Sequence, residues 1–440
     1  MIARRKGWLV GQPEGARVQS RAAFYTSRLL GQAGQTLLLV ALFMISGARH
    51  SAMELSAAFV AMMAAAVLFG LPAGAVADWM GARRAFVTGA ALRAIAIVSA
   101  FLVIDRPEWV WAVVFLYSAV SQLFSPAELA LVGVVHRSRP GITHTALVLL
   151  QYAGQAAGLL ALAPLLHLVG GLSMMLAGAA VLQSTATVSA LYCVARAGTG
   201  EATPIRASRR AAFDLGTTFR FLASDVRAAY AVVLLAFCQL AVKALAITLP
   251  PYVADDLQLS IRELAVIAAV AGVGGMAGFF WTSRTLTLGV APRALKVTLL
   301  LMVLSLLTLA LLNGRFIASP GSGFEALEPL NLLRASSFAV PFSIAAALAI
   351  SLTVAPIGAR TILTETAPPE HQARVFATQA IVTDIVVMLP LLLSGLGTQF
   401  AGARVTLLVL AAVGLAMFLL LEHVMTRAGR EAQATSVALP

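Results

Sequence analysis

The chain has 440 residues, of which 60% are hydrophobic and only 11% charged, and its mean hydropathy is +0.90. A soluble globular protein of this length is excluded, because it would need far more charge to cover its surface. The formal net charge of +12 does not indicate nucleic-acid binding, since the basic residues lie in short loops between apolar stretches.

Apolar stretches of about 20 residues recur along the chain, which is the length that crosses a hydrocarbon core of ~30 Å. No water is present there to satisfy the backbone, so the stretches must be helices. The sequence predicts twelve spans in two sets of six, with a polar stretch between the sets. The first set covers roughly 22–46, 52–77, 85–104, 109–135, 143–169 and 172–195, and the second 229–254, 261–283, 294–313, 335–359, 375–398 and 403–425.

This pattern predicts five regions, which are an N-terminal arm (1–20), a six-helix bundle (21–195), a linker (196–227), a second six-helix bundle (228–425) and a tail (426–440). About 23 Lys and Arg residues fall on the side of the arm, linker and tail, and about 6 on the other side. The positive-inside rule therefore places both termini in the cytoplasm, in a multi-pass protein of the plasma or inner membrane.

The two halves echo each other in sequence. Pro126 and Pro356 occupy matching places in the fourth and tenth spans, and Pro140 and Pro369 follow each of them at a similar distance. An internal repeat of six plus six helices is the architecture of transporters that rock two bundles about a central site.

The stretch Gly70–Arg84, GLPAGAVADWMGARR, closes the second span. Its Gly74, Asp78, Gly81, Arg83 and Arg84 resemble the signature G-x-x-x-D-[RK]-x-G-[RK]-[RK] of the major facilitator superfamily, with Trp79 in place of the basic residue and the basic pair displaced by one. The segments LGQAGQTLLLVALF, FSPAELAL and ETAPPEHQARVF are similar to a branch with bacterial efflux and siderophore exporters and, more distantly, lysophospholipid transporters. The resemblance implies an all-α fold of two six-helix bundles that acts as a monomer.

In that superfamily the turn latches the two halves in the outward-open state. The resemblance therefore implies a gating motif of Gly74, Asp78, Gly81, Arg83 and Arg84. Related transporters also place an acid in the fourth span, so we expect Glu128 to pair with Arg83 or Arg84 and to release the latch when it is protonated. The alternative is a plain cytoplasmic loop whose charges only set the topology. The second copy of the turn keeps just Gly278 and Arg284.

Two ionisable residues lie near the middle of predicted spans, where each needs a partner or a function. Lys243 in the seventh span suits an anionic substrate group such as a carboxylate, catecholate or phosphate. Asp384 in the eleventh span lies within ~7 Å of the same depth and is a candidate counter-ion and proton carrier. A purely structural ion pair is the alternative. For Arg93, in the third span, we expect snorkelling or structural pairing.

Uncharged polar side chains add a candidate substrate lining. The first and fourth helices of each half line the cavity in this fold, which selects Gln35, Gln122 and Gln239 beside Lys243. Interhelical hydrogen bonding is the alternative for each. The stretches Ala153–Gly158 and Ala271–Gly278 carry small residues on spans that the resemblance places at the seam between halves.

The sequence thus predicts a secondary active transporter that moves a small amphipathic or organic-anion solute by alternating access. Export is the expected direction, and proton coupling is one way to drive it. A lysophospholipid or lipid flippase and a non-transporting membrane scaffold or sensor are the alternatives. The expected partners are membrane lipids, the solute and protons, with no nucleic acid. No catalytic residue, cofactor or metal site is expected, since the spans show no Ser/His, HExxH or paired-Asp arrangement.

Overall fold

The computed structural model describes residues 14–47, 52–103, 106, 109–135, 147, 150–151, 153–196, 215–257, 261–286, 291–312, 336–366 and 372–437. Within these ranges the chain forms helices and short connections and no strand. Seven described helices are long and apolar enough to cross a membrane: Val18–Ile45, Ala52–Gly70, Ala163–Arg196, Val226–Asp256, Val340–Thr366, Thr378–Phe400 and Ala403–His423. The prediction of an all-α polytopic membrane protein is confirmed.

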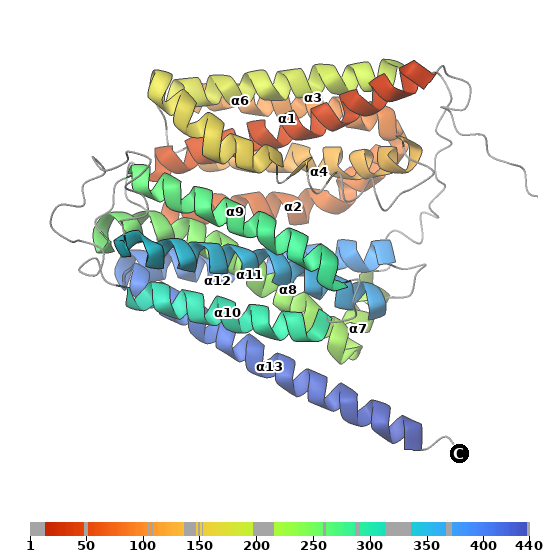
Figure 1. Cartoon of the computed structure of the whole chain (residues 1–440). Coiled ribbons are helices and arrows are strands. Elements are labelled where there is room, and N and C mark those ends of the chain that lie inside the picture. Colours follow the sequence, from red (N-terminus) through yellow and green to blue (C-terminus); the bar gives the residue numbers. More distant parts are fainter. Residues whose placement is uncertain are drawn as a thin grey trace, which may run out of the picture. The chain divides into compact units, whose positions relative to one another are not determined.

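The chain divides into two compact units, of which the first comprises Met1–Ser51 and Ala57–Ser208 and the second Ala52–Ser56 and Arg209–Pro440 (Figure 1). The first unit contains α1 (Glu14–Gly47), α2 (Ala52–Met80) from Ala57 onward, α3 (Ala82–Ser99), α4 (Val110–Val135), the π-helix η3 (Ala157–Leu162) and α6 (Ala163–Arg196). The second contains α7 (Leu215–Ser224), α8 (Val226–Pro251), η4 (Tyr252–Asp256), α9 (Ile261–Leu286), α10 (Ala291–Leu311), α11 (Ser336–Thr366), α12 (Gln372–Phe400) and α13 (Ala403–Val437).

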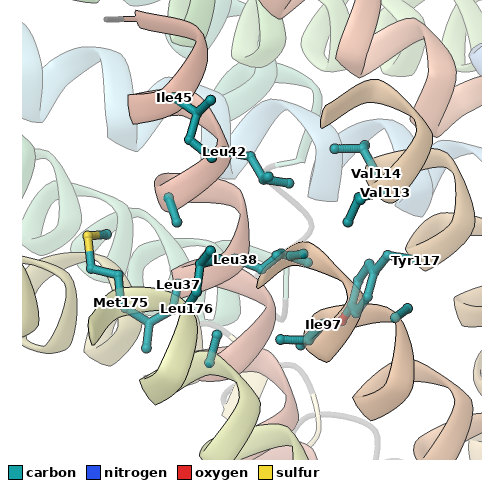
Figure 2. Close-up of a cluster of buried hydrophobic side chains, with 14 of the residues drawn as sticks. Leu37, Leu38, Leu42, Ile45, Ile97, Val113, Val114, Tyr117, Met175 and Leu176 are labelled. Carbon is teal, nitrogen blue, oxygen red and sulfur yellow. The ribbon is translucent and has the colours of Figure 1, made fainter. Parts of the chain in front are cut away.

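In the first unit α1 packs against α6 and η3, while α3 packs against α4 and α6. One apolar cluster joins α1, α3, α4 and α6 through buried side chains that include Leu38, Ile97, Tyr117 and Met175 (Figure 2). A second cluster contains the stacked rings of Phe86 and Phe124, whose centroids are 4.9 Å apart. These two clusters hold α1, α3 and α4 in fixed register, which positions the polar side chains described below.

The second unit repeats these pairings. α10 packs against α11 and α13 as α3 packs against α4 and α6, and α8 packs against α12 as α1 packs against η3. α9 also packs against α11, and in the first unit α2 and α4 are joined by a bond of 2.7 Å from the Ser118 hydroxyl to the Met62 carbonyl. The packing therefore supports the internal repeat that Pro126 and Pro356 indicated in the sequence.

The ribbon labelled α6 contains a break at two glycines. Gly170 and Gly171 leave the helical conformation, and Gly171 has a φ of 63°, in the left-handed region that favours glycine. The break lies between the predicted fifth span (143–169) and the predicted sixth span (172–195). Helical structure also extends beyond the predicted spans, since α1 begins at Glu14, α13 continues to Val437 and the predicted linker contains α7.

Four glycines of the small-residue stretches allow close helix packing inside each unit. A Cβ on Gly154 or Gly158 would lie 2.6 Å from the Leu29 carbonyl or 2.8 Å from the Ala33 carbonyl of α1, and one on Gly274 or Gly278 would meet the α11 backbone at 2.7 Å or 3.1 Å. The expectation that the two stretches form a seam between the halves stays a prediction. The open sides of these four glycines are filled by helices of their own unit.

We expect Gly274→Ala to lower the free energy of unfolding by about 1–3 kcal/mol relative to Gly275→Ala. A Cβ at Gly274 would lie 2.7 Å from the Ala346 carbonyl oxygen, whereas at Gly275 its nearest neighbour would be the Thr353 hydroxyl at 3.4 Å. Both changes gain the same helix propensity, so the difference isolates the steric contact. Unfolding by SDS in mixed micelles, followed by far-UV circular dichroism, measures it. Equal midpoints would show that α9 and α11 do not pack this closely.

Candidate functional site

A charged pair lies inside the first unit. Arg28 of α1 donates from Nη1 to Glu128 Oε2 of α4 at 2.5 Å, and from Nη2 to Gln151 Oε1 at 2.8 Å. Glu128 is only 4% exposed, and its Oε1 has no hydrogen-bond partner among the described residues. A carboxylate so placed needs a cation inside the bundle, because burial of an unpaired charge is costly. The helix α1 supplies that cation.

This pairing corrects the expectation that Glu128 binds Arg83 or Arg84. Those two arginines begin α3, where Arg84 is exposed and Arg83 is half-buried. Burial lowers the pKa of the Arg83 guanidinium below its usual value. Glu128 instead lies in the interior of the unit, where its Oε2 pairs with Arg28.

Arg93 of α3 is the second cation buried in this unit, with 3% of its surface exposed. Its Nε donates to the Tyr117 hydroxyl at 3.0 Å, its Nη2 donates to Gln35 Oε1 at 3.1 Å and also to Tyr117, and its guanidinium lies 4.8 Å from the centroid of the Phe124 ring. Of the two expectations for Arg93, structural pairing is confirmed and snorkelling is wrong. The side chain joins α1, α3 and α4.

Arg28, Arg93 and Glu128 form one group, which we call the charge cluster. Arg93 lies over Phe124, and Phe124 precedes Glu128 on α4 by one helical turn, or about 6 Å along the axis. Arg93 also acts electrostatically on both Arg28 and Glu128. The cluster therefore contains two cations and one carboxylate.

In the second unit the structure brings Lys243 and Asp384 together. Lys243 Nζ of α8 lies 4.0 Å from Asp384 Oδ1 of α12, and the side chains are 13% and 18% exposed. Gln239, one turn before Lys243 on α8, donates from Nε2 to the same carboxylate oxygen. A separation of 4.0 Å exceeds the roughly 2.7–2.9 Å of a charge-assisted hydrogen bond. The two charges neutralise each other without a direct bond between them.

The three glutamines predicted to line a substrate path are half-buried and have distinct partners. Gln35 accepts from Arg93, Gln239 donates to Asp384, and Gln122 Nε2 lies 3.4 Å from the Ser118 carbonyl of its own helix. Interhelical hydrogen bonding, the alternative considered from the sequence, describes Gln35 and Gln239. Each of these two amides holds a charged group in place.

The gating turn is a tight connection between α2 and α3. Gly81 has a φ of 81°, a conformation that few other residues adopt, and its carbonyl accepts the first hydrogen bond of α3 from Ala85 N at 3.0 Å. Gly74 and Asp78 belong to α2, and the side chain of Asp78 lies outside the described part of the structure, as does that of Arg284 in the second copy. Trp79 is 85% exposed.

Sequence reasoning missed Arg28 and Tyr117 as members of this site and expected no function for Arg93, whereas Gln151 is one of several glutamines that it considered as a possible substrate lining. A signal was present, since Arg28, Gln32 and Gln35 recur at the spacing of one helical face. Arg28 is one of the roughly 23 basic residues whose distribution predicts the topology.

Two helical units that repeat the same packing, each with an ion pair between its own helices, define the fold of a multi-pass membrane protein. The solved structures agree. The nucleoside transporter NupG is 12% identical with a TM-score of 0.66, covering 93% of this chain and 99% of its own. The POT family transporter PepTSo is 11% identical with a TM-score of 0.67, covering 94% and 98%.

A bacterial homologue of the human lysosomal transporter Spinster, solved in an inward-facing and unoccupied conformation, is 13% identical with a TM-score of 0.64, covering 94% of this chain and 99% of its own. No protein-family model matches the chain, and no curated protein matches its sequence. The likenesses are to the fold, and they confirm the predicted all-α fold class, which this chain shares with these transporters.

Proposed function

We propose that this chain is a secondary active transporter that moves a small amphipathic or organic-anion solute across the cytoplasmic membrane by alternating access. Lys243, Asp384 and Gln239 carry the proposal. A buried ion pair adds little net stability, yet ionisable groups inside a membrane are expensive to place. Two opposite charges held 4.0 Å apart at mid-span are suited to separate and re-form during transport. The shared fold with a nucleoside transporter and POT family transporters supports the same conclusion.

Proton coupling follows from the chemistry of this pair. A proton taken up by Asp384 removes its attraction for Lys243, and the freed ammonium then needs another anion. Glu128 offers a comparable change in the first unit, because its Oε1 is buried and unpaired among the described residues. Protonation of either acid would therefore weaken contacts between helices that must move. A proton entering the cell by this route would drive export of the solute.

Flux in proteoliposomes tests the function. The purified chain is reconstituted in phosphatidylcholine vesicles, and movement of radiolabelled naphthalenesulfonate, a permanent organic anion, is followed with and without an imposed pH gradient. We expect concentrative, gradient-dependent flux that protein-free vesicles lack. Flux that ignores the pH gradient would reject proton coupling. Movement of fluorescent lysolipid in place of the anion would support the lipid flippase, and failure to move either probe would reject transport.

We also propose that the turn Gly70–Arg84 controls gating on the cytoplasmic side through Asp78. The left-handed Gly81 fixes the reversal that follows this acid. We expect Asp78→Asn to shift the population away from outward-open, measured by the reactivity of cysteines introduced at the two ends of the spans. Asp225→Asn is the matched control, because Asp225 caps α8 by accepting bonds from Arg227 N and Ala228 N, and asparagine also caps helices well. An Asp78→Asn reactivity pattern like that of the control would reduce the turn to a topogenic loop.

A further inference from the structure

The two units differ in their buried charge. In the second unit Lys243 faces Asp384, so the pair is neutral. In the first unit Glu128 pairs with Arg28, and the described partners of Arg93 are the neutral Tyr117 hydroxyl, the Gln35 amide and aromatic rings. The charge cluster therefore keeps one positive charge that no described carboxylate balances.

A purely structural tie between α1, α3 and α4 would not need this charge. A neutral amide or hydroxyl makes interhelical hydrogen bonds without the desolvation cost that a buried guanidinium carries. Neutral acceptors and aromatic faces reduce the desolvation cost of burying the Arg93 guanidinium, but they do not neutralise its positive charge. An unbalanced cation inside a membrane protein is suited to a ligand that brings the missing negative charge.

We infer that the charge cluster of Arg28, Arg93 and Glu128 is the subsite for the oxyanion of the substrate, a carboxylate, sulfonate or phosphate. The inference rests on the proposed transport function and identifies the part of the chain that binds the anionic group. It moves that group from Lys243, which sequence reasoning favoured, to the first unit. Lys243 is already neutralised by Asp384 and has less net charge to offer.

The geometry assigns different roles to the two arginines. The Arg28 side chain is 15% exposed and its partner Gln151 is half-buried, so an oxyanion reaches Arg28 first. A guanidinium binds oxyanions through two parallel hydrogen bonds, so Arg28 is the binding residue. When the ligand takes donors of Arg28, Glu128 still has the charge of Arg93, whose guanidinium lies over the ring of Phe124, one helical turn from Glu128 on α4. Arg93, at 3% exposure, is a positioning residue that acts through Glu128. The loaded site then contains two cations and two anions.

Equilibrium dialysis tests the assignment with three probes that share a naphthalene ring: naphthalenesulfonate, naphthylmethanol and naphthylmethylamine. The full chain is held in phosphatidylcholine nanodiscs. We expect the sulfonate to bind at least about tenfold more tightly than the alcohol or the amine, since charge-assisted hydrogen bonds are the strong ones. Arg28→Gln should weaken sulfonate binding about tenfold and leave the alcohol unchanged.

The role of Arg93 is tested by a measurement that would not change if the residue only supported the structure. Arg93→Met should remove the preference for the sulfonate over the alcohol, and Arg93→Lys, which keeps the charge, should restore most of it. A loss of binding for sulfonate and alcohol alike in both variants would assign Arg93 to structure alone and overturn its part in the subsite. Lys296→Met is the control, because Lys296 belongs to a half-exposed pair outside both sites, and it should change sulfonate binding less than about threefold. Lys243→Gln tests the other cation as the binding residue.

A second set of nanodiscs, containing phosphatidylglycerol, identifies the source of the oxyanion. Competition by this lipid would identify a lipid headgroup as the source of the oxyanion, and unchanged sulfonate binding would identify a free solute.

Sulfonate binding lost in Lys243→Gln and kept in Arg28→Gln would overturn the assignment, as would equal binding of sulfonate and alcohol by the wild-type chain. Arg28-dependent binding without flux in proteoliposomes would reject transport and leave the subsite standing. Flux in proteoliposomes together with sulfonate binding that depends on Lys243 would support transport and overturn the subsite.

Discussion

Replacing Glu128 with alanine is expected to lower the free energy of unfolding by about 3–5 kcal/mol. Glu128 is 4% exposed, pairs with Arg28 and is the carboxylate of the charge cluster that also contains Arg93. Its removal leaves both guanidinium groups in a low-dielectric interior without a counter-charge, and one of them loses a hydrogen bond of 2.5 Å. SDS unfolding in mixed micelles, followed by circular dichroism, measures the change.

The matched control is Glu422→Ala. Glu422 pairs with Lys296 at 2.7 Å, but the two side chains are 40% and 33% exposed, so solvent screens the pair and the loss should stay below about 1 kcal/mol. The double variant Arg28→Met/Glu128→Leu should recover much of the stability lost in Glu128→Ala, since an apolar pair of similar size leaves only Arg93 charged. Equal losses for Glu128→Ala and Glu422→Ala would show that Glu128 is solvated.

Much of the fold could be predicted from the sequence because membrane helices follow from local composition. Hydrocarbon thickness fixes the length of a span, and Gly170–Gly171 marks the break between two of them. Helix ends were less predictable. α1 begins at Glu14, in a stretch rich in charged residues, because a helix can continue into water after its apolar face ends.

The site could be predicted only in part, because depth in the membrane is readable from sequence and the direction of a side chain is not. Similar depths correctly suggested Lys243 and Asp384 as partners. Glu128 was assigned to Arg83 or Arg84 by analogy, whereas the rotation of α1 and α4 turns it toward Arg28. Arg28 lies about 21 Å along the axis from the first residue of α1, well inside the helix. Counting it as a loop charge concealed its role.

Asp384→Asn is expected to separate two kinds of transport. Asparagine resembles the protonated carboxyl group in shape and charge, so Lys243 is permanently released from its counter-ion. We expect exchange of naphthalenesulfonate between the two sides to continue within about threefold of wild type, while accumulation driven by a pH gradient falls at least about tenfold, the effect of losing a charge interaction of ~1.4 kcal/mol or more. Counterflow and gradient-driven uptake in proteoliposomes measure the two rates.

Two further variants decide between coupling and structure. Lys296→Met removes a cation from a half-exposed pair of the same unit and should leave both rates unchanged. Lys243→Met leaves Asp384 without a cation, which favours its neutral form, and should also lose accumulation more than exchange. If the pair were structural only, Asp384→Asn and Lys243→Met would lose exchange and accumulation together, with lower stability in SDS unfolding. Accumulation that persists in Asp384→Asn would exclude this carboxyl group as the proton carrier and leave Glu128 as the buried acid to test next.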